Sequence, residues 1–235
     1  MTKIGRIRSP IVLAGLLLCV CGCGGPQDPV VEMQRTLATA PEYMIVLEDM
    51  REEGTIFENF YHKYTVTQGT RSRTTDWIEV PEKVFRQYEP FLGMALVAKS
   101  DQGVNDTPHP AGYHYVGNPQ YGRWGERDGR SFWEFYGQYA MMRSLFSMGG
   151  GGHMVVYRND WDGYRTSRER RQPYFGRNRE WGTQGSVTQK QKPSAFARRK
   201  AAVASKNRSF AQKVQSRTGR SRSGFGSRSS GGRGK

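Results

Sequence analysis

The sequence predicts an α+β fold for a small body at 42–180, and two observations lead to that prediction. The segment 42–98 contains short runs of β-branched and aromatic residues separated by turn residues, which is typical of a β-hairpin and a short sheet. The segment 132–148 carries aromatic residues at helical spacing, which predicts one long helix. Only 36% of the 235 residues are hydrophobic, so the segments outside this body add little to a core.

The predicted hairpin pairs residues 44–47 with residues 55–67 across a turn at 51–54. Further strands are expected at 77–80 and 94–98, where the same residue types recur. These four segments are short, so they indicate a small sheet and not a large barrel.

A short helix is expected between the last two strands. Pro81 suits a first helical position, and Pro90 is expected to end the helix. The stretch 100–130 is rich in Gly and Pro and is interpreted as a loop whose tyrosines pack back on the body. A carbohydrate or peptide platform is the alternative for these aromatic residues.

The helix predicted at 132–148 begins at a capping box formed by Ser131 and Glu134 and ends at the glycines 149–152. Its aromatic face either belongs to the core or lies against a bilayer or a partner protein, and the sequence leaves both open. The residues assigned to membrane or partner contact are Phe132, Trp133, Phe135, Tyr136, Tyr139 and Phe146.

The charge is divided unevenly along the chain. The net charge is +15, yet residues 24–180 are nearly neutral, whereas residues 181–235 hold 14 basic groups and no acidic one. The tail at 181–235 is rich in Arg, Ser and Gly and is predicted to be disordered. We expect it to bind an anionic lipid or envelope polymer through arginines, namely Arg217, Arg220, Arg222, Arg228 and Arg233.

The N-terminus has the plan of an export signal. Lys3, Arg6 and Arg8 precede an apolar run at 11–20, which is too short to span a bilayer. The following Val20-Cys21-Gly22-Cys23 resembles a bacterial lipobox, with Cys21 in an unusual place for that pattern. The resemblance implies cleavage after Gly22 and acylation of Cys23, and more than one acyl chain would anchor the protein durably. An ordinary cleaved signal or an uncleaved anchor is the alternative.

The resemblance also implies a cellular location. Residues 1–22 would be the signal peptide, and residues 23–41 the lipidated N-terminus and linker. Gly24 stands where an Asp resembles an inner-membrane retention signal, so the outer membrane is favoured if the cell is Gram-negative. The three cysteines all lie within the first 23 residues, which excludes a disulfide scaffold or a cysteine metal site in the body.

One metal motif is nearly present. Residues 158–169 match a calcium loop, with Asp160, Asp162 and Glu169 at ligand positions, but Arg158 takes the place of the first acidic ligand. A polar turn is the preferred interpretation, and we expect no metal and no other cofactor.

No catalytic motif occurs in the sequence, so the sequence does not predict an enzyme. An envelope enzyme would require His109, His114, Asp160 or Glu169 to cluster in one pocket.

A wider resemblance covers short pieces of 131–235. Ser131-Phe132-Trp133, Met141-Met142, the glycines 149–152, and Gly224-Phe225-Gly226 look like envelope lipoproteins of the YgiB type. No activity is assigned to that group, so the resemblance implies a location and not a mechanism.

These observations lead to one functional expectation. The protein is expected to be a membrane-anchored lipoprotein of the bacterial cell envelope with a binding or structural role. Its expected partners are membrane lipid at Cys23, an anionic surface at the tail, and an envelope protein. A nucleic-acid-binding protein is the alternative, since Arg-rich tails of this kind bind RNA, but the export signal argues against it.

Overall fold

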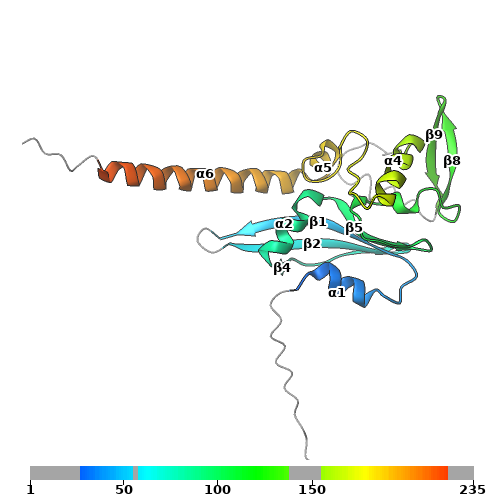
Figure 1. Ribbon diagram of the computed structural model, residues 1–235, viewed down its shortest axis with the longest axis horizontal. Helices are drawn as coiled ribbons and strands as arrows, with labels where there is room; N and C mark the ends of the chain where they lie inside the picture. Colours follow the sequence, from blue (N-terminus) through cyan, green and yellow to red (C-terminus); the bar gives the residue numbers. More distant parts are fainter. Residues whose placement is uncertain (1–26, 55–57, 138–154, 222–235) are drawn as a thin grey trace, which may run out of the picture.

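The computed structural model describes residues 27–54, 58–137 and 155–221, with only the backbone described at 218–221. A seven-stranded antiparallel sheet forms the centre of the body, with strand order β3-β2-β1-β5-β6; β4 pairs with β2, and β7 pairs with β5. With helices and antiparallel strands both present, the predicted α+β class is confirmed (Figure 1). The strands of the sheet are β1 Tyr43–Glu53, β2 Asn59–Gln68, β3 Arg71–Thr74, β4 Ile78–Val80, β5 Met94–Ser100, β6 Gly103–Asn105 and β7 His109–Pro110.

The predicted hairpin is confirmed as β1 and β2, which pair with Ile45 opposite Val66. The turn expected at 51–54 is wrong for residues 51–53, because β1 continues to Glu53, which pairs with Asn59. Side chains alternate between two buried clusters, because successive residues of a strand point to opposite faces. Ile45 and Leu47 belong to the larger cluster, whereas Met44 and Val46 pack with alanines of β5. The strands predicted at 77–80 and 94–98 are confirmed as β4 and β5.

Helix α1, Pro29–Thr36, joins the N-terminal segment to the sheet. Asp28 caps it by accepting a hydrogen bond from the Val30 amide at 2.9 Å, and its other carboxylate oxygen accepts one from the Tyr88 hydroxyl at 2.7 Å. Because Pro29 and Val30 are buried, the expectation that 23–41 is only a linker is wrong for residues 29 onward.

The helix predicted after Pro81 is confirmed as α2, Glu82–Tyr88, which buries Val84 and Phe85. The α-helix ends at Tyr88, two residues before Pro90, and the chain continues through a 3-10 turn, η1, Glu89–Phe91.

The tyrosines of 100–130 pack back on the body, as the sequence predicts. Tyr113 and Tyr115, in the 3-10 turn η2 Tyr113–Tyr115, are fully buried, and so is Tyr121. They belong to a second cluster that is mostly aromatic and also holds Trp133 and Trp181. The stretch is less irregular than expected, since β6, β7 and β8, Gly122–Arg127, also lie within it.

The helix predicted at 132–148 is wrong where the structure describes it. Residues 130–135 form β9, Arg130–Phe135, which pairs with β8, Gly122–Arg127, in a separate two-stranded sheet. Asp128 and Gly129 connect the strands with φ angles of 54° and 70°, as a two-residue type I′ turn requires. Glu134 pairs with Arg123 across the hairpin at 3.2 Å and caps no helix. Residues 138–148 lie outside the described residues.

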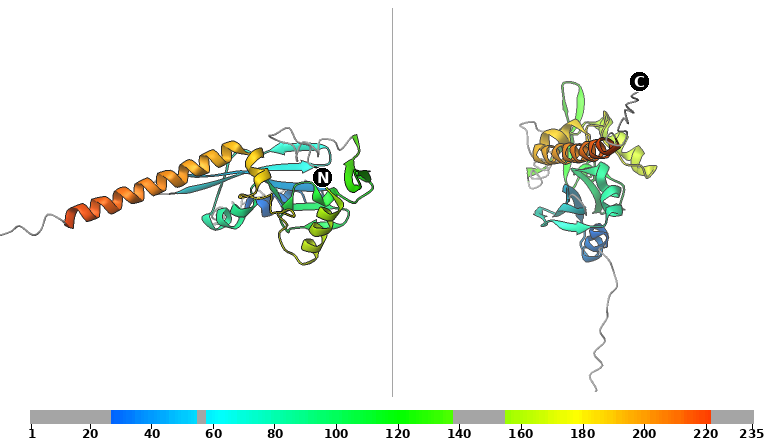
Figure 2. Two further views of the ribbon diagram at one scale, coloured as in Figure 1. Left: turned by 90° about the horizontal axis from the view of Figure 1, so that it is seen from above. Right: turned by 90° about the vertical axis from the view of Figure 1, so that its left-hand side faces the viewer.

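The C-terminal region is also more ordered than predicted. Helices α4, Arg158–Glu169, and α5, Ser186–Gln191, lead into α6, Pro193–Ser221, which extends from the body as a long arm (Figures 1 and 2). Trp181, the first residue of the expected disordered tail, is only 1% exposed. Alanine, lysine and arginine fill α6, and these residues favour helix strongly. Residues 222–235 lie outside the described residues.

Candidate functional site

The N-terminal half of α6 lies beside the β1–β2 hairpin, on the side opposite α1 in both Figure 1 and the right-hand view of Figure 2. Ala195 and Phe196 of α6 pack against the larger core cluster, and ion pairs join α6, together with Lys192 just before it, to the hairpin and to η1. Lys192 pairs with Glu48 at 2.5 Å, and Lys206 pairs with Glu52 at 2.5 Å and with Glu58 at 3.0 Å. Two further pairs join Arg198 to Asp49 and Arg199 to Glu89.

We call the five carboxylates that pair with α6 or with Lys192 just before it the acidic belt: Glu48, Asp49, Glu52, Glu58 and Glu89. A groove of about 460 Å³ remains between α6 and the sheet, with Met50, Phe85 and Phe196 in its wall. Apolar side chains therefore do not fill the interface between α6 and the sheet completely. Each exposed ion pair contributes only about 0.2–1 kcal/mol, so several pairs together hold the arm.

The ionisation of Glu52 makes the docking of α6 dependent on pH. Burial acts to raise the pKa of Glu52, but the hydrogen bond and charge of Lys206, together with Arg86, outweigh it and hold that pKa below its ordinary value. A carboxyl whose pKa is lowered by folding stabilises the folded state above its unfolded pKa, and this stabilisation is lost as the pH falls through the lowered pKa.

We therefore expect Glu52→Gln to reduce the acid sensitivity of folding. Urea unfolding at about pH 6 and pH 3 should show a smaller loss of unfolding free energy in Glu52→Gln than in the wild type. Glu79→Gln is the matched control, because Glu79 is an exposed carboxylate of the same sheet with no ion pair among the described residues. An identical loss in all three proteins would contradict the role of Glu52.

C-terminal to Lys206, α6 extends past the acidic belt. Arg208, Lys213 and Arg217 are exposed, and no carboxylate of the described residues pairs with any of them. Phe210 is 69% exposed. The arm has 29 residues and is about 43 Å long. Within the described ranges, no helix has the length and apolar character to cross a membrane.

One face of α6 continues from the docked half into the free half. Residues 199, 206, 210, 213 and 217 follow one another at spacings of seven, four, three and four, which places them on one side of a helix. Arg199 and Lys206 bind the acidic belt, so Phe210, Lys213 and Arg217 extend the same face past the sheet. We call these three residues the distal stripe.

The predicted tail arginines are only partly described. Arg217 is exposed on the distal stripe, and Arg220 lies in α6 with only its backbone described. Arg222, Arg228 and Arg233 lie outside the described residues, as does the lipidation candidate Cys23.

The predicted aromatic contact set does not form one exposed face. Trp133 and Phe135 are buried in the aromatic cluster, and Phe132 is half-buried with the Arg127 guanidinium 5.4 Å from its ring centre. Tyr136 is 42% exposed and is the one member among the described residues that is open to solvent. Tyr139 and Phe146 lie outside the described residues.

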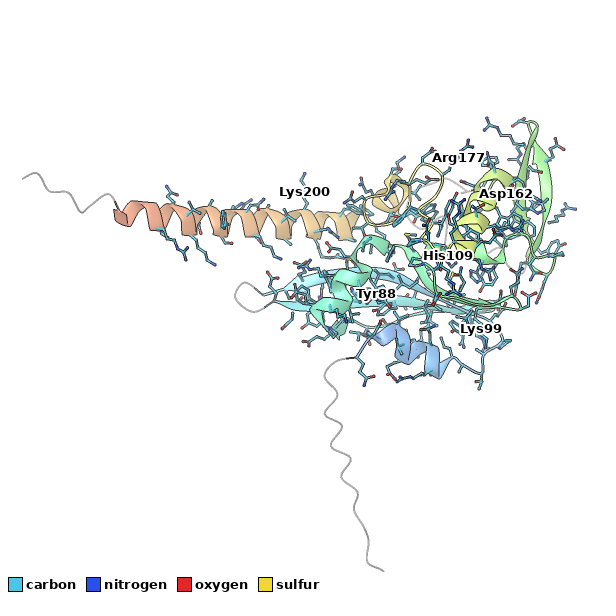
Figure 3. All side chains as sticks on the ribbon, viewed as in Figure 1. Tyr88, Lys99, His109, Asp162, Arg177 and Lys200 are labelled. Carbon is cyan, nitrogen blue, oxygen red and sulfur yellow. The ribbon has the colours of Figure 1, made fainter. Side chains whose placement is uncertain are left out.

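Residues 158–169 form helix α4, so the calcium-loop candidate and the polar turn preferred for this segment are both wrong. Asp160 and Asp162 are two residues apart and therefore point to opposite sides of the helix. Asp160 instead accepts a hydrogen bond from Tyr174 at 3.0 Å. Asp162, which is labelled in Figure 3, lies 3.9 Å from Arg158. Glu169 is exposed at the far end of α4. Within the described ranges, no three His, Cys, Asp or Glu side chains could hold a metal ion.

Two histidines that the enzyme hypothesis requires to meet do lie together. The rings of His109 and His114 are 5.7 Å apart, and both side chains are buried. Burial lowers the pKa of His109 to about 4 and holds that of His114 well below its ordinary value, so both are neutral at neutral pH. Glu169 lines the same cavity as His114, but Asp160 lines a different one. The predicted cluster is therefore only partly assembled.

Comparisons with protein-family models, curated proteins and solved structures find no match for this chain.

Proposed function

We propose that this protein is a lipoprotein of the bacterial cell envelope, anchored by acylated Cys23, that holds a cationic helical arm against an anionic lipid surface. Its role is binding or structural. The observation that carries this proposal is the distal stripe, where two cations and an exposed phenylalanine share one face of a helix that has no acidic residue.

The mixture of charge and apolar area favours lipid over a soluble polymer. Lysine and arginine near an anionic bilayer each contribute about 1 kcal/mol, and a helical aromatic residue between them enters the boundary between headgroups and acyl chains. A hydrated polymer would bind Lys213 and Arg217 but would leave Phe210 in water.

The position of the anchor supports the same proposal. Cys23 precedes Asp28 by five residues, and an extended chain of that length spans at most about 18 Å. Acylation at Cys23 would therefore keep the body close to the bilayer. The arm, about 43 Å long, would then meet the anionic surface at a high effective concentration.

Metabolic labelling with a fatty-acid probe tests the anchor. We expect label in the wild-type chain and none in Cys23→Ser, with Cys21→Ser as the matched control that keeps its label. Cell fractionation should place the wild type in the membrane fraction. Unchanged labelling of Cys23→Ser, or a cytosolic chain that co-purifies with nucleic acid, would refute the anchored lipoprotein.

A further inference from the structure

A cavity of about 560 Å³ lies beside the C-terminal half of α4, away from the arm. The turn between β5 and β6 contributes Gln102 to its wall, and η2 contributes His114. Another side of the cavity is formed by three residues of α4, namely Trp161, Arg165 and Arg168. Figure 3 shows His109, the neighbour of His114, between the sheet and α4.

Gly117 allows Trp161 to form part of this wall. A Cβ atom at Gly117 would lie 2.3 Å from the indole ring, and the φ of Gly117 is +86°, which side chains rarely adopt. Any other residue here would displace Trp161, so a glycine is required for the cavity to keep its shape.

His114 is the buried polar group of the cavity. Its side chain is 7% exposed, and neither ring nitrogen has a hydrogen-bond partner among the described residues. A neutral imidazole carries one donor and one acceptor, and a buried polar group left without a partner is destabilising. His109 adds a second unpartnered nitrogen, Nε2, since its Nδ1 donates to the Thr107 carbonyl at 2.8 Å.

Two arginines bring positive charge to the same cavity. Gln102 orients Arg168, whose Nη1 donates to the Gln102 side-chain oxygen at 3.0 Å. The Arg165 guanidinium lies 5.0 Å from the centre of the Trp161 ring. No carboxylate of the described residues pairs with either arginine, and Glu169 is the single acidic residue that lines the cavity.

We propose that this cavity binds a small solute through an oxyanion, either a carboxylate or a phosphate. Arg165 and Arg168 would donate to its oxygens, as guanidinium groups do with planar oxyanions. His114 lines the same cavity, and both of its ring nitrogens are buried without a partner among the described residues. A turn of the ring would bring one N–H to a ligand oxygen, which would accept a hydrogen bond from it. This inference is independent of the lipid anchor and of the arm.

Titration of the full chain with inorganic phosphate and, separately, with acetate tests the proposal. Sodium chloride at equal ionic strength is the reference. The readout is the side-chain NMR signal of His114, assigned by its absence in His114→Gln, together with tryptophan fluorescence. We expect saturable changes with one of the two anions, and the stronger of the two identifies the oxyanion class.

Arg168→Gln should weaken this binding at least tenfold, and Arg165→Gln should also weaken it. Arg170→Gln is the matched control, because Arg170 is exposed at the end of α4 and does not line the cavity. If His114→Gln fails to fold, the two arginine variants still decide the outcome. Linear changes without saturation, or equal weakening by Arg170→Gln, would overturn the proposal.

Discussion

Replacing Trp181 with alanine is expected to lower the free energy of unfolding by about 3–5 kcal/mol, which is typical of a large aromatic side chain removed from a core. Trp181 is 1% exposed and belongs to the aromatic cluster, and its amide donates to the Phe175 carbonyl at 3.0 Å. Its indole nitrogen has no partner among the described residues, so the loss would come from packing and not from a broken hydrogen bond.

Phe210→Ala is the matched control for this prediction. Both residues are aromatic and lie in the basic region 181–235, but Phe210 is 69% exposed. We expect Phe210→Ala to change the unfolding free energy by less than about 0.5 kcal/mol. Urea unfolding followed by circular dichroism measures both. Equal effects of the two substitutions would contradict the burial of Trp181, because they would place it outside the core.

The second large effect is expected on the arm. Lys213→Gln combined with Arg217→Gln should lower the ratio of surface-bound to free arm about thirtyfold, because each charge contributes about 1 kcal/mol at an anionic bilayer. The matched control is Lys200→Gln combined with Arg208→Gln. It removes the same charge from the other sides of α6, and Lys200 points away from the hairpin (Figure 3).

Comparison of the two double variants distinguishes lipid binding by one face of α6 from attraction by net charge alone. If only net charge matters, both should lose the same affinity, and the distal stripe would have no special role. A loss confined to the variant at 213 and 217 supports the stripe. The measurement is the emission of an environment-sensitive fluorophore on a cysteine at 210 in the full chain, reconstituted in vesicles that contain phosphatidylglycerol.

Four of the seven strands of the sheet, β1, β2, β4 and β5, were predictable from local pattern, whereas the short strands β3, β6 and β7 were not. The hairpin at 122–135 could also have been predicted. The pairing of β1 with β2 is predicted by two runs of β-branched residues with a turn between them. Asp128-Gly129 is the same kind of signal and indicates a two-residue hairpin, but the aromatic residues after Ser131 also fit helical spacing. Burial decided the outcome, because alternation places Trp133 and Phe135 together in the core.

The candidate site was less predictable, because its contacts join residues far apart in the chain. The basic character of α6 is visible in the sequence, but Lys206 meets Glu52 across 154 residues, and nothing local indicates that pair. His114 and Arg168 likewise share a cavity only because α4 packs near the turn after β5. The tail was predicted to be disordered from its Arg-, Ser- and Gly-rich composition, whereas the alanines of α6 and the acidic belt favour a docked helix.

Binding of the anchored arm to anionic lipid is the central claim, and one fluorescence comparison tests it most directly. The full chain with Phe210→Cys or Ala211→Cys carries the fluorophore and is reconstituted first in phosphatidylcholine vesicles and then in vesicles that also contain phosphatidylglycerol. We expect a blue shift at 210 only with the anionic lipid, no shift at 211, and reversal when salt is raised from about 0.1 M to 1 M. Emission at 210 that is the same in both lipids would contradict the account.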